Sequence, residues 1–166
     1  MRNIIAFPIL GLAVVLQTSM VSELKLLNGY ADLPLILIAA WALQERVESA
    51  WHWAAVICLF VGFITRLPWF ILVIGYFGIV YIARSLQRQV WQAPLLAMFS
   101  VVFIGTLFMH LLSYATLTIL GTPFSFSEVA TLITLPALLL NILLSIPVYT
   151  LMRDLSYWVY PTEVME

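Results

Sequence analysis

The longest uncharged stretch of the chain constrains its fold more than any other feature. Between Arg88 and Glu128 lie 39 residues without Asp, Glu, Lys or Arg, and another 24 such residues separate Glu128 from Arg153. Of the 166 residues, 64% are hydrophobic and only 9% are charged. A water-soluble domain of this size needs more surface charge, so most of this chain must lie in lipid. The sequence therefore predicts a polytopic integral membrane protein of the all-α class.

Hydrophobic segments use nearly the whole chain, so we predict one transmembrane domain over residues 1–166. The six predicted spans are 4–21, 26–44, 51–65, 68–83, 94–120 and 128–152. The second is strongly apolar only over 33–44, so it either starts near Leu26 or is short or broken. Pro136 and Pro147 interrupt the last span. Such spans require neighbouring helices to shield the loosened backbone, so we expect an irregular six-helix bundle.

The distribution of Lys and Arg predicts the orientation of the bundle. Basic residues concentrate in cytoplasmic loops, and an N-terminus inside the cell would put five of the seven there. The inside set is Arg2, Arg46, Arg84, Arg88 and Arg153, and the outside set is Lys25 and Arg66. We therefore expect both termini inside, which requires an even number of spans. Merging the third and fourth spans would break this parity, but Arg66 and Pro68 favour a turn between them.

The sequence contains no pattern that is typical of catalysis. Most of the eight acidic residues fall at predicted span ends or in the tails, and none lies in the middle of a predicted span. No HExxH, GxSxG or Walker sequence occurs, and the single cysteine, Cys58, sits in an apolar run. We predict no enzymatic activity, no cofactor and no metal site. With seven Lys and Arg residues and a net charge of -1, nothing in the chain is basic enough to predict a nucleic-acid partner.

Two predicted spans carry polar residues along one helical face. In the fifth span, Thr106, His110 and Ser113 follow the spacing i, i+4, i+7. The stripe on the sixth span comprises Thr131, Thr134, Asn141, Ser145 and Tyr149. In lipid both stripes should face the bundle interior, where each polar group can find a partner. Hydrogen bonding between helices is one interpretation, a ligand-lining wall is the other, and His110 is the most suggestive residue for transport or proton handling.

The first span is the candidate for contact with a partner helix. Pro8, Gly11 and Thr18 lie near one of its faces. Small residues allow two helices in a membrane to approach closely. We expect the partner site to be lipid-facing and mostly apolar.

Three segments combine polar residues with apolar runs in a recognisable order. Residues 30–37 read YADLPLIL, with an acid at the start of the second span, and 61–64 read VGFI in the third. Residues 135–149 read LPALLLNILLSIPVY, with Asn before Pro, and LMR at 151–153 adds a basic end. In this order they resemble the rod-shape-determining MreD family, whose members have about six spans and no soluble domain. The chain departs from the family at Arg66, in a segment where the family usually has Gly and then Asp.

The resemblance implies a fold similar to the substrate-binding S components of energy-coupling-factor vitamin transporters. It also implies a non-enzymatic scaffold of the cell-wall elongation machinery in the bacterial cytoplasmic, or inner, membrane. The implied partners are MreC, the glycosyltransferase RodA, a class B penicillin-binding transpeptidase and, indirectly, MreB. The alternative is a substrate-binding subunit of such a vitamin transporter, which the chain length, the span count and the polar faces also favour.

Overall fold

The fold is known from a computed structural model that describes residues 2–89, 93–122 and 125–161. Within these ranges 82% of the residues are helical and none lies in a β-strand, which confirms the all-α prediction. The α-helices are α1 (Ala6–Ser19), α2 (Leu33–Ala42), α3 (Ala50–Ile64), α4 (Trp69–Gln89), α5 (Pro94–Ile119), α6 (Phe126–Glu128) and α7 (Leu135–Val159). The 3₁₀ helices η1 (Arg2–Ile5) and η2 (Val21–Glu23) flank α1, and the π-helix η3 (Val129–Thr134) joins α6 to α7.

Four helical stretches are long and apolar enough to cross a membrane. They are Ala6–Glu23, Trp69–Arg88, Pro94–Ile119 and Phe126–Val159. α2 has 10 residues and α3 has 15, so they are shorter apolar helices. A helix of α2's length rises about 15 Å, roughly half the thickness of the hydrocarbon core. The described chain is thus a membrane-type helical bundle with four candidate spans and two short helices.

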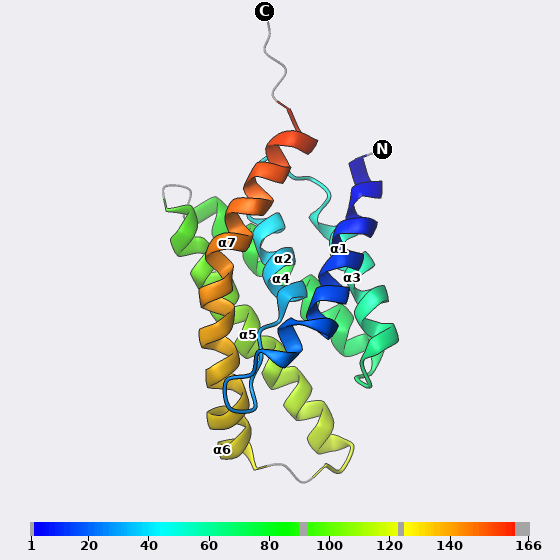
Figure 1. The fold of residues 1–166 in the computed structure, drawn as a ribbon, viewed down its shortest axis with the longest axis vertical. Helices are drawn as coiled ribbons and strands as arrows, with labels where there is room; N and C mark the ends of the chain where they lie inside the picture. Colours follow the sequence, from blue (N-terminus) through cyan, green and yellow to red (C-terminus); the bar gives the residue numbers. More distant parts are fainter. Residues whose placement is uncertain (1, 90–92, 123–124, 162–166) are drawn as a thin grey trace, which may run out of the picture.

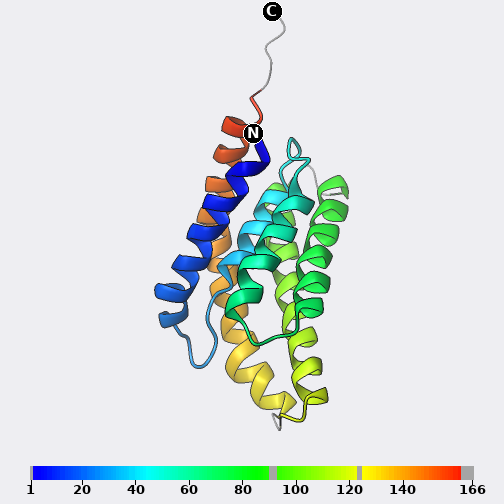
Figure 2. The same ribbon diagram turned by 90° about the vertical axis from the view of Figure 1, so that its right-hand side faces the viewer.

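The long helices alternate in direction along the bundle, so that α1, α3 and α5 run one way and α2, α4 and α7 the other (Figures 1 and 2). α1 begins and α7 ends at one end of the bundle, called the terminal end below. The segment 43–49 between α2 and α3 lies there too. The segment 20–32, the turn between α3 and α4, and the start of α6 lie toward the opposite end, called the distal end. An even number of passes would give this arrangement.

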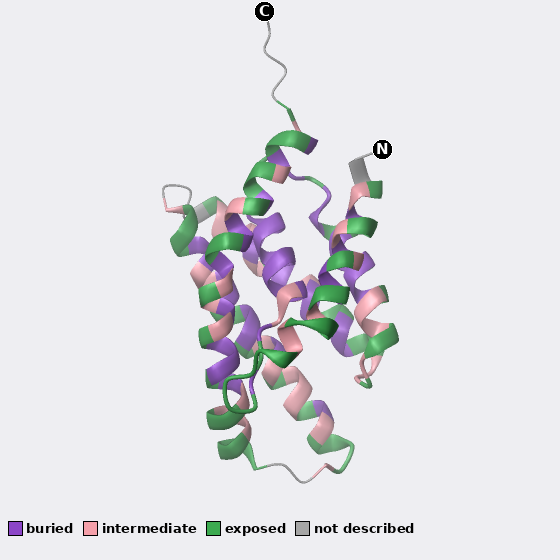
Figure 3. Ribbon diagram, in the orientation of Figure 1, coloured by how far each residue is buried: buried purple, intermediate pink, exposed green. Residues whose placement is uncertain are grey.

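The centre of the bundle is α2, the shortest of the main helices. Nine of its ten residues are buried, and Figure 3 shows it as a continuous buried element among partly exposed neighbours. It packs against α1, α3, α4, α5 and α7. A helix that is apolar on every face can be stable only when other elements surround it. The outer helices instead expose many large apolar side chains, as a lipid environment requires.

The predicted second span, 26–44, is helical only over its second part. Helix α2 starts at Leu33 because the Asp32 carboxylate accepts a hydrogen bond from the Leu35 N–H at 3.0 Å, and Pro34 occupies the first turn. The residues before it form a loop closed by a bridge between Leu26 and Gly29. Of the two alternatives left open by the sequence, the short helix is the one that forms.

The other two departures are helices that run past their predicted ends. α4 continues to Gln89 instead of ending at 83, and the last helix continues to Val159 instead of ending at 152. Five of the six residues 84–89 are polar, but Arg, Leu and Gln are all good helix formers. The polar residues at the end of a predicted span therefore indicate where the apolar part of the helix stops, and the helix itself continues beyond that point.

The last helix passes Pro136 with the help of the segment 20–32. Pro136 has no N–H to donate, and it follows directly on the π-helical turn η3, which contains Leu132. The backbone N–H of Asn28 donates to the Leu132 oxygen at 3.0 Å. Gly29 lies so close that an added Cβ would be 2.4 Å from the Ile133 oxygen. The π-helical turn η3 and this loop thus fit together only because residue 29 has no side chain.

Candidate functional site

Two side-chain amides hold the segment that leads into α2. The Asp32 N–H donates to Asn141 Oδ1 at 2.7 Å, and Asn141 Nδ2 donates to Thr106 Oγ1 at 2.9 Å. Asn141 and Thr106 are both fully buried. The predicted polar faces of the fifth and sixth spans therefore do meet here, in a hydrogen-bonded chain that joins α2, α5 and α7.

Gln17 of α1 provides the second of these amides. Its Nε2 donates to the Ala31 carbonyl at 2.8 Å, and its Oε1 accepts from the Leu33 N–H at 2.8 Å. Backbone groups of a non-helical segment inside a membrane protein need such internal partners. Gln17 is not among the polar residues predicted to face the bundle. The signal that could have found it is that it is the one amide within the apolar first span.

Of the remaining predicted polar residues, His110 and Thr134 contact each other across two elements, whereas Ser113 and Ser145 make no hydrogen bond to another helix within the described residues. His110 Nδ1 lies 3.0 Å from Thr134 Oγ1, so this pair bridges α5 to the π-helical turn. Ser113 lies one turn further along α5 and makes no hydrogen bond to the described residues. Ser145 is fully buried, but its hydroxyl donates to the Ile142 carbonyl of its own helix at 2.6 Å. Ser145 therefore lies inside the bundle, but it makes this hydrogen bond within its own helix and not to a neighbouring one.

A cavity of ≈ 450 Å³ opens beside these residues toward the distal end. It lies between the end of α1, the start of α2, the α3–α4 turn, α5 and η3 (Figure 1 labels the α-helices). Its polar lining residues are Gln17, Thr18, Ser22, Tyr30, Asp32, Thr65, Tyr76, His110 and Ser113. Its apolar lining includes Val61, Leu72, Met109 and Ile133. Volume and lining fall in the range of small-molecule sites, so we call it the distal cavity and treat it as the candidate site.

The distal cavity contains polar groups that the protein itself does not satisfy. The Oδ1 atom of Asp32 caps α2, but within the described residues no donor reaches Oδ2. The hydroxyls of Tyr30, Tyr76 and Ser113 likewise make no hydrogen bond within the described residues. The lining holds no Lys or Arg, so Asp32 carries the principal charge of the cavity. Within the same part of the chain no group of three His, Cys, Asp or Glu residues could hold a metal ion.

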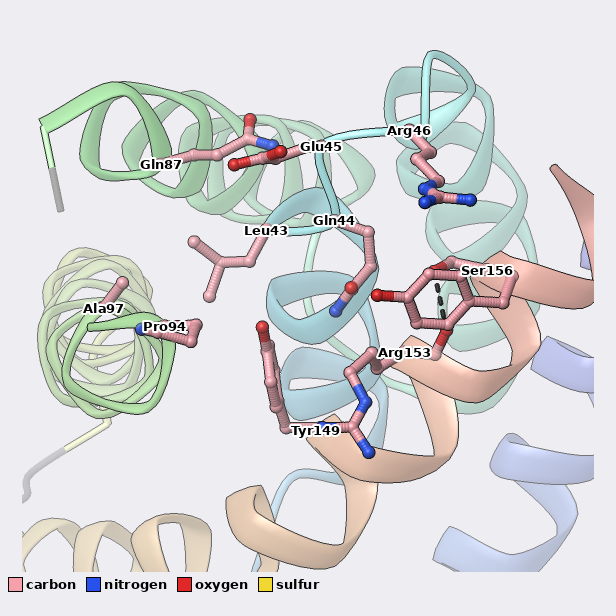
Figure 4. Close-up of a pocket in the computed structure, with 11 residues that line it drawn as sticks. Leu43, Gln44, Glu45, Arg46, Gln87, Pro94, Ala97, Tyr149, Arg153 and Ser156 are labelled. Atoms are coloured by element: carbon pink, nitrogen blue, oxygen red, sulfur yellow. Dashed lines mark hydrogen bonds between the residues drawn. The ribbon is translucent and has the colours of Figure 1, made fainter. Parts of the chain in front are cut away.

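A second cavity, of ≈ 300 Å³, lies at the terminal end (Figure 4). Glu45 and Arg46 come from the segment after α2, and Tyr149 and Arg153 from α7. Both cations are already engaged, since Arg46 lies 4.5 Å from the centroid of the Tyr157 ring and Arg153 pairs with Asp154. This cavity is a space between helix ends with charges of both signs.

The terminal end of α2 is closed by Arg84 of α4. Its guanidinium donates to the carbonyls of Gln44 and Val47 and to the Gln87 side chain. A cation beside the last carbonyls of a helix also compensates its dipole. Next to it, Trp41 and Trp53 stack with ring centroids 4.2 Å apart and are almost fully buried. Their Nε1 atoms are the buried side-chain polar atoms without a partner in the described part of the chain.

The candidate partner residues on α1 do not form one surface. Pro8 is exposed, but Gly11 faces α3, since an added Cβ would be 4.0 Å from the Phe60 ring. Thr18 lines the distal cavity, and its hydroxyl donates to the Val14 carbonyl. The exposed large apolar side chains of α1 are instead Phe7, Leu12, Val15 and Leu16.

Any functional assignment has to be argued from the residues and the structure of this chain, because comparisons with known proteins give no match. No family model, curated protein or solved structure matches the chain.

Proposed function

We propose that this protein is a non-enzymatic scaffold subunit of the bacterial cell-wall elongation machinery, of the MreD type. One observation supports this more than any other. The two main segments of the MreD resemblance, 30–37 and 135–149, lie more than 90 residues apart in sequence but meet in the fold. The Asp32 N–H of one donates to the Asn141 side chain of the other at 2.7 Å. The resemblance thus falls on residues that build the centre of the bundle together.

The proposed topology has six spans in the cytoplasmic membrane with both termini inside. The two short helices α2 and α3 would count as spans because longer neighbours enclose them, as discontinuous helices are enclosed in other membrane proteins. The placement of the start of α1 and the end of α7 at one end of the bundle supports the even number (Figure 2). The basic residues Arg46, Arg84 and Arg153 lie toward the same end, which supports the cytoplasmic assignment.

The proposed docking site for the single span of MreC is the outer side of α1. This helix packs against α2 and α3 and leaves Phe7, Leu12 and Val15 exposed by 51%, 60% and 57%. Large apolar side chains on the lipid-facing side of a peripheral helix can pack against another helix without any change in the bundle. RodA, the transpeptidase and MreB would then be reached through MreC or other parts of the complex.

Co-purification with MreC tests the scaffold role. MreC co-expressed with the parent chain should be retained when the chain is captured from detergent-solubilised membranes. Leu12→Trp should reduce the retained MreC, because added bulk on the outer side of α1 would prevent close packing. Leu143→Trp is the matched control, since Leu143 is 67% exposed but lies on α7. Equal retention by both variants would remove α1 as the docking site. No retention by the parent chain would contradict the scaffold role.

The distal cavity favours a second candidate, a substrate-binding subunit of an energy-coupling-factor vitamin transporter. A volume of ≈ 450 Å³ and several unsatisfied polar groups are more than helix packing requires. Purification followed by mass spectrometry tests this role. A small molecule retained in stoichiometric amount by a chain that does not bind MreC would favour the transporter.

A further inference from the structure

The distal cavity has a buried inner part and an exposed mouth, and its lining contains both polar and apolar side chains. Tyr76 on α4 is only 2% exposed, whereas Tyr30 is 47% exposed, so the first lies deep in the cavity and the second at its mouth. Asp32 sits between the bundle interior and the cavity, at the start of the most buried helix. Apolar side chains from α3, α4 and α5 line the rest. A bound molecule would therefore meet both polar atoms and an extensive apolar wall.

The charge of the lining selects the sign of the ligand. Asp32 has one carboxylate oxygen engaged in the α2 cap and one that lacks a donor within the described residues. No Lys or Arg lines the cavity, and His110 is held by Thr134. An ionised carboxylate shielded from bulk water is costly unless a cation or several donors pair with it. An anionic ligand would add repulsion, and a neutral one would leave the carboxylate without a cation.

The chemistry of the remaining lining selects an organic cation over a metal ion. Asp32 is the single acid of the lining, and hard metal ions require several oxygen ligands. Phenol rings such as those of Tyr30 and Tyr76 attract alkylammonium groups that lie over their faces. Val61, Leu72 and Met109 offer contacts to the apolar part of such a molecule.

We infer that the distal cavity binds a small amphipathic organic cation, with an ammonium group paired to Asp32 and an apolar body against Val61, Leu72 and Met109. This site is separate from the outer side of α1, so binding does not depend on the scaffold role or on MreC.

Three matched probes test the inference on the full chain in lipid nanodiscs. They are 4-phenylbutylamine, 4-phenylbutanol and 4-phenylbutyrate, which share one apolar body and differ in the charge of the polar group. Isothermal titration calorimetry, with empty nanodiscs titrated in parallel, measures binding beyond partition into lipid. The amine should bind about tenfold more tightly than the alcohol, because a charge-assisted hydrogen bond replaces a neutral one. The acid should bind most weakly.

Asp32→Asn separates recognition from folding. Asn caps helices as well as Asp does, so α2 and the thermal unfolding midpoint should be retained. The variant should lose the preference for the amine over the alcohol. Asp154→Asn is the matched control, because Asp154 is exposed on α7 outside the cavity, and it should keep the parent's preference.

Several outcomes would overturn the inference. One is equal affinity for the three probes, which would indicate an apolar cavity filled by lipid. Another is amine binding that survives in Asp32→Asn. No binding of any probe by folded protein would also overturn it, as would tighter binding of the acid.

Discussion

The two ends of α2 are stabilised in opposite ways. At its terminal end, a long cationic side chain, Arg84, donates to carbonyls of the following segment, and the stacked pair of Trp41 and Trp53 fills the adjacent space. At its distal end, two neutral amides hold the backbone, and the Asp32 carboxylate is left beside a cavity. A helix too short to span the bilayer needs partners at both ends. At the terminal end, the charged group of Arg84 is engaged in hydrogen bonds to the protein, whereas at the distal end one oxygen of the Asp32 carboxylate faces the cavity without a donor from the described residues. A ligand would therefore act at the distal end.

The largest expected contrast between the ends is their accessibility from outside the cell. Cysteines at Lys25 and Thr122, near the distal end, should react with a membrane-impermeant maleimide in intact cells, and a cysteine at Arg88 should not. The parent chain is the control, because Cys58 is buried and should remain unlabelled. Labelling at residue 88 in intact cells would contradict the proposed topology.

The next largest effect should come from opening the terminal end. Arg84→Ala removes the donors to the Gln44 and Val47 carbonyls, so the free energy of unfolding should fall by about 3 kcal/mol. Reversible unfolding in mixed micelles measures this change. Arg88→Ala, one turn further and exposed, should change it by less than about 0.5 kcal/mol. Similar values for both variants would show that Arg84 does not secure this end.

At the distal end, the fit between the segment 20–32 and η3 should be sensitive to one methyl group. Gly29→Ala places a Cβ against the Ile133 carbonyl, so it should cost about 2 kcal/mol of unfolding free energy. Gly11→Ala is the matched control, since its Cβ would make only an ordinary contact with Phe60 at 4.0 Å. Unfolding in bicelles compares the two, and a neutral Gly29→Ala would mean that this contact is loose.

The smallest of these effects concerns the amide that holds Asp32. Asn141→Leu removes the acceptor for the Asp32 N–H and the donor to Thr106, and should lower stability by roughly 0.5–2 kcal/mol. A double-mutant cycle with Thr106→Val isolates the bond between the two side chains. Unchanged unfolding of Asn141→Leu would indicate that water or another group replaces the amide.

Structural features are easiest to predict from the sequence where a residue type has a single physical explanation, such as the lack of charge in a segment that lies in lipid. The uncharged runs gave the helical class, and the polar spacing on two spans placed Thr106 and Asn141 on facing helices, which do contact. The sequence predicts less well where a residue's partner is distant. Gln17 and Asp32 act through bonds to residues of other elements, up to 109 positions away, and no local pattern marks such pairs.

Ser145 and Gly11 differ from their predictions because each has another possible partner inside the bundle. Ser145 lies on the correct face, but a serine in a helix can bond to its own backbone, and it does so here. The spacing of small residues predicts that Gly11 faces a partner outside the bundle, but small residues also allow close contacts inside a bundle, and Gly11 faces Phe60. Spacing along one helix thus identifies a face but does not say what lies opposite.

The bond between Asp32 and Asn141 also has a consequence for biosynthesis. The ribosome completes residue 32 long before residue 141, and at 5–20 residues per second the interval of 109 residues takes roughly 5–20 s. Throughout that time α2 is too short to insert stably alone, and its leading backbone has no Asn141 and no η3 to bond with. The start of α2 therefore obtains its full set of hydrogen bonds only after η3 and α7 have been made, and until then Gln17 is its partner from the first helix.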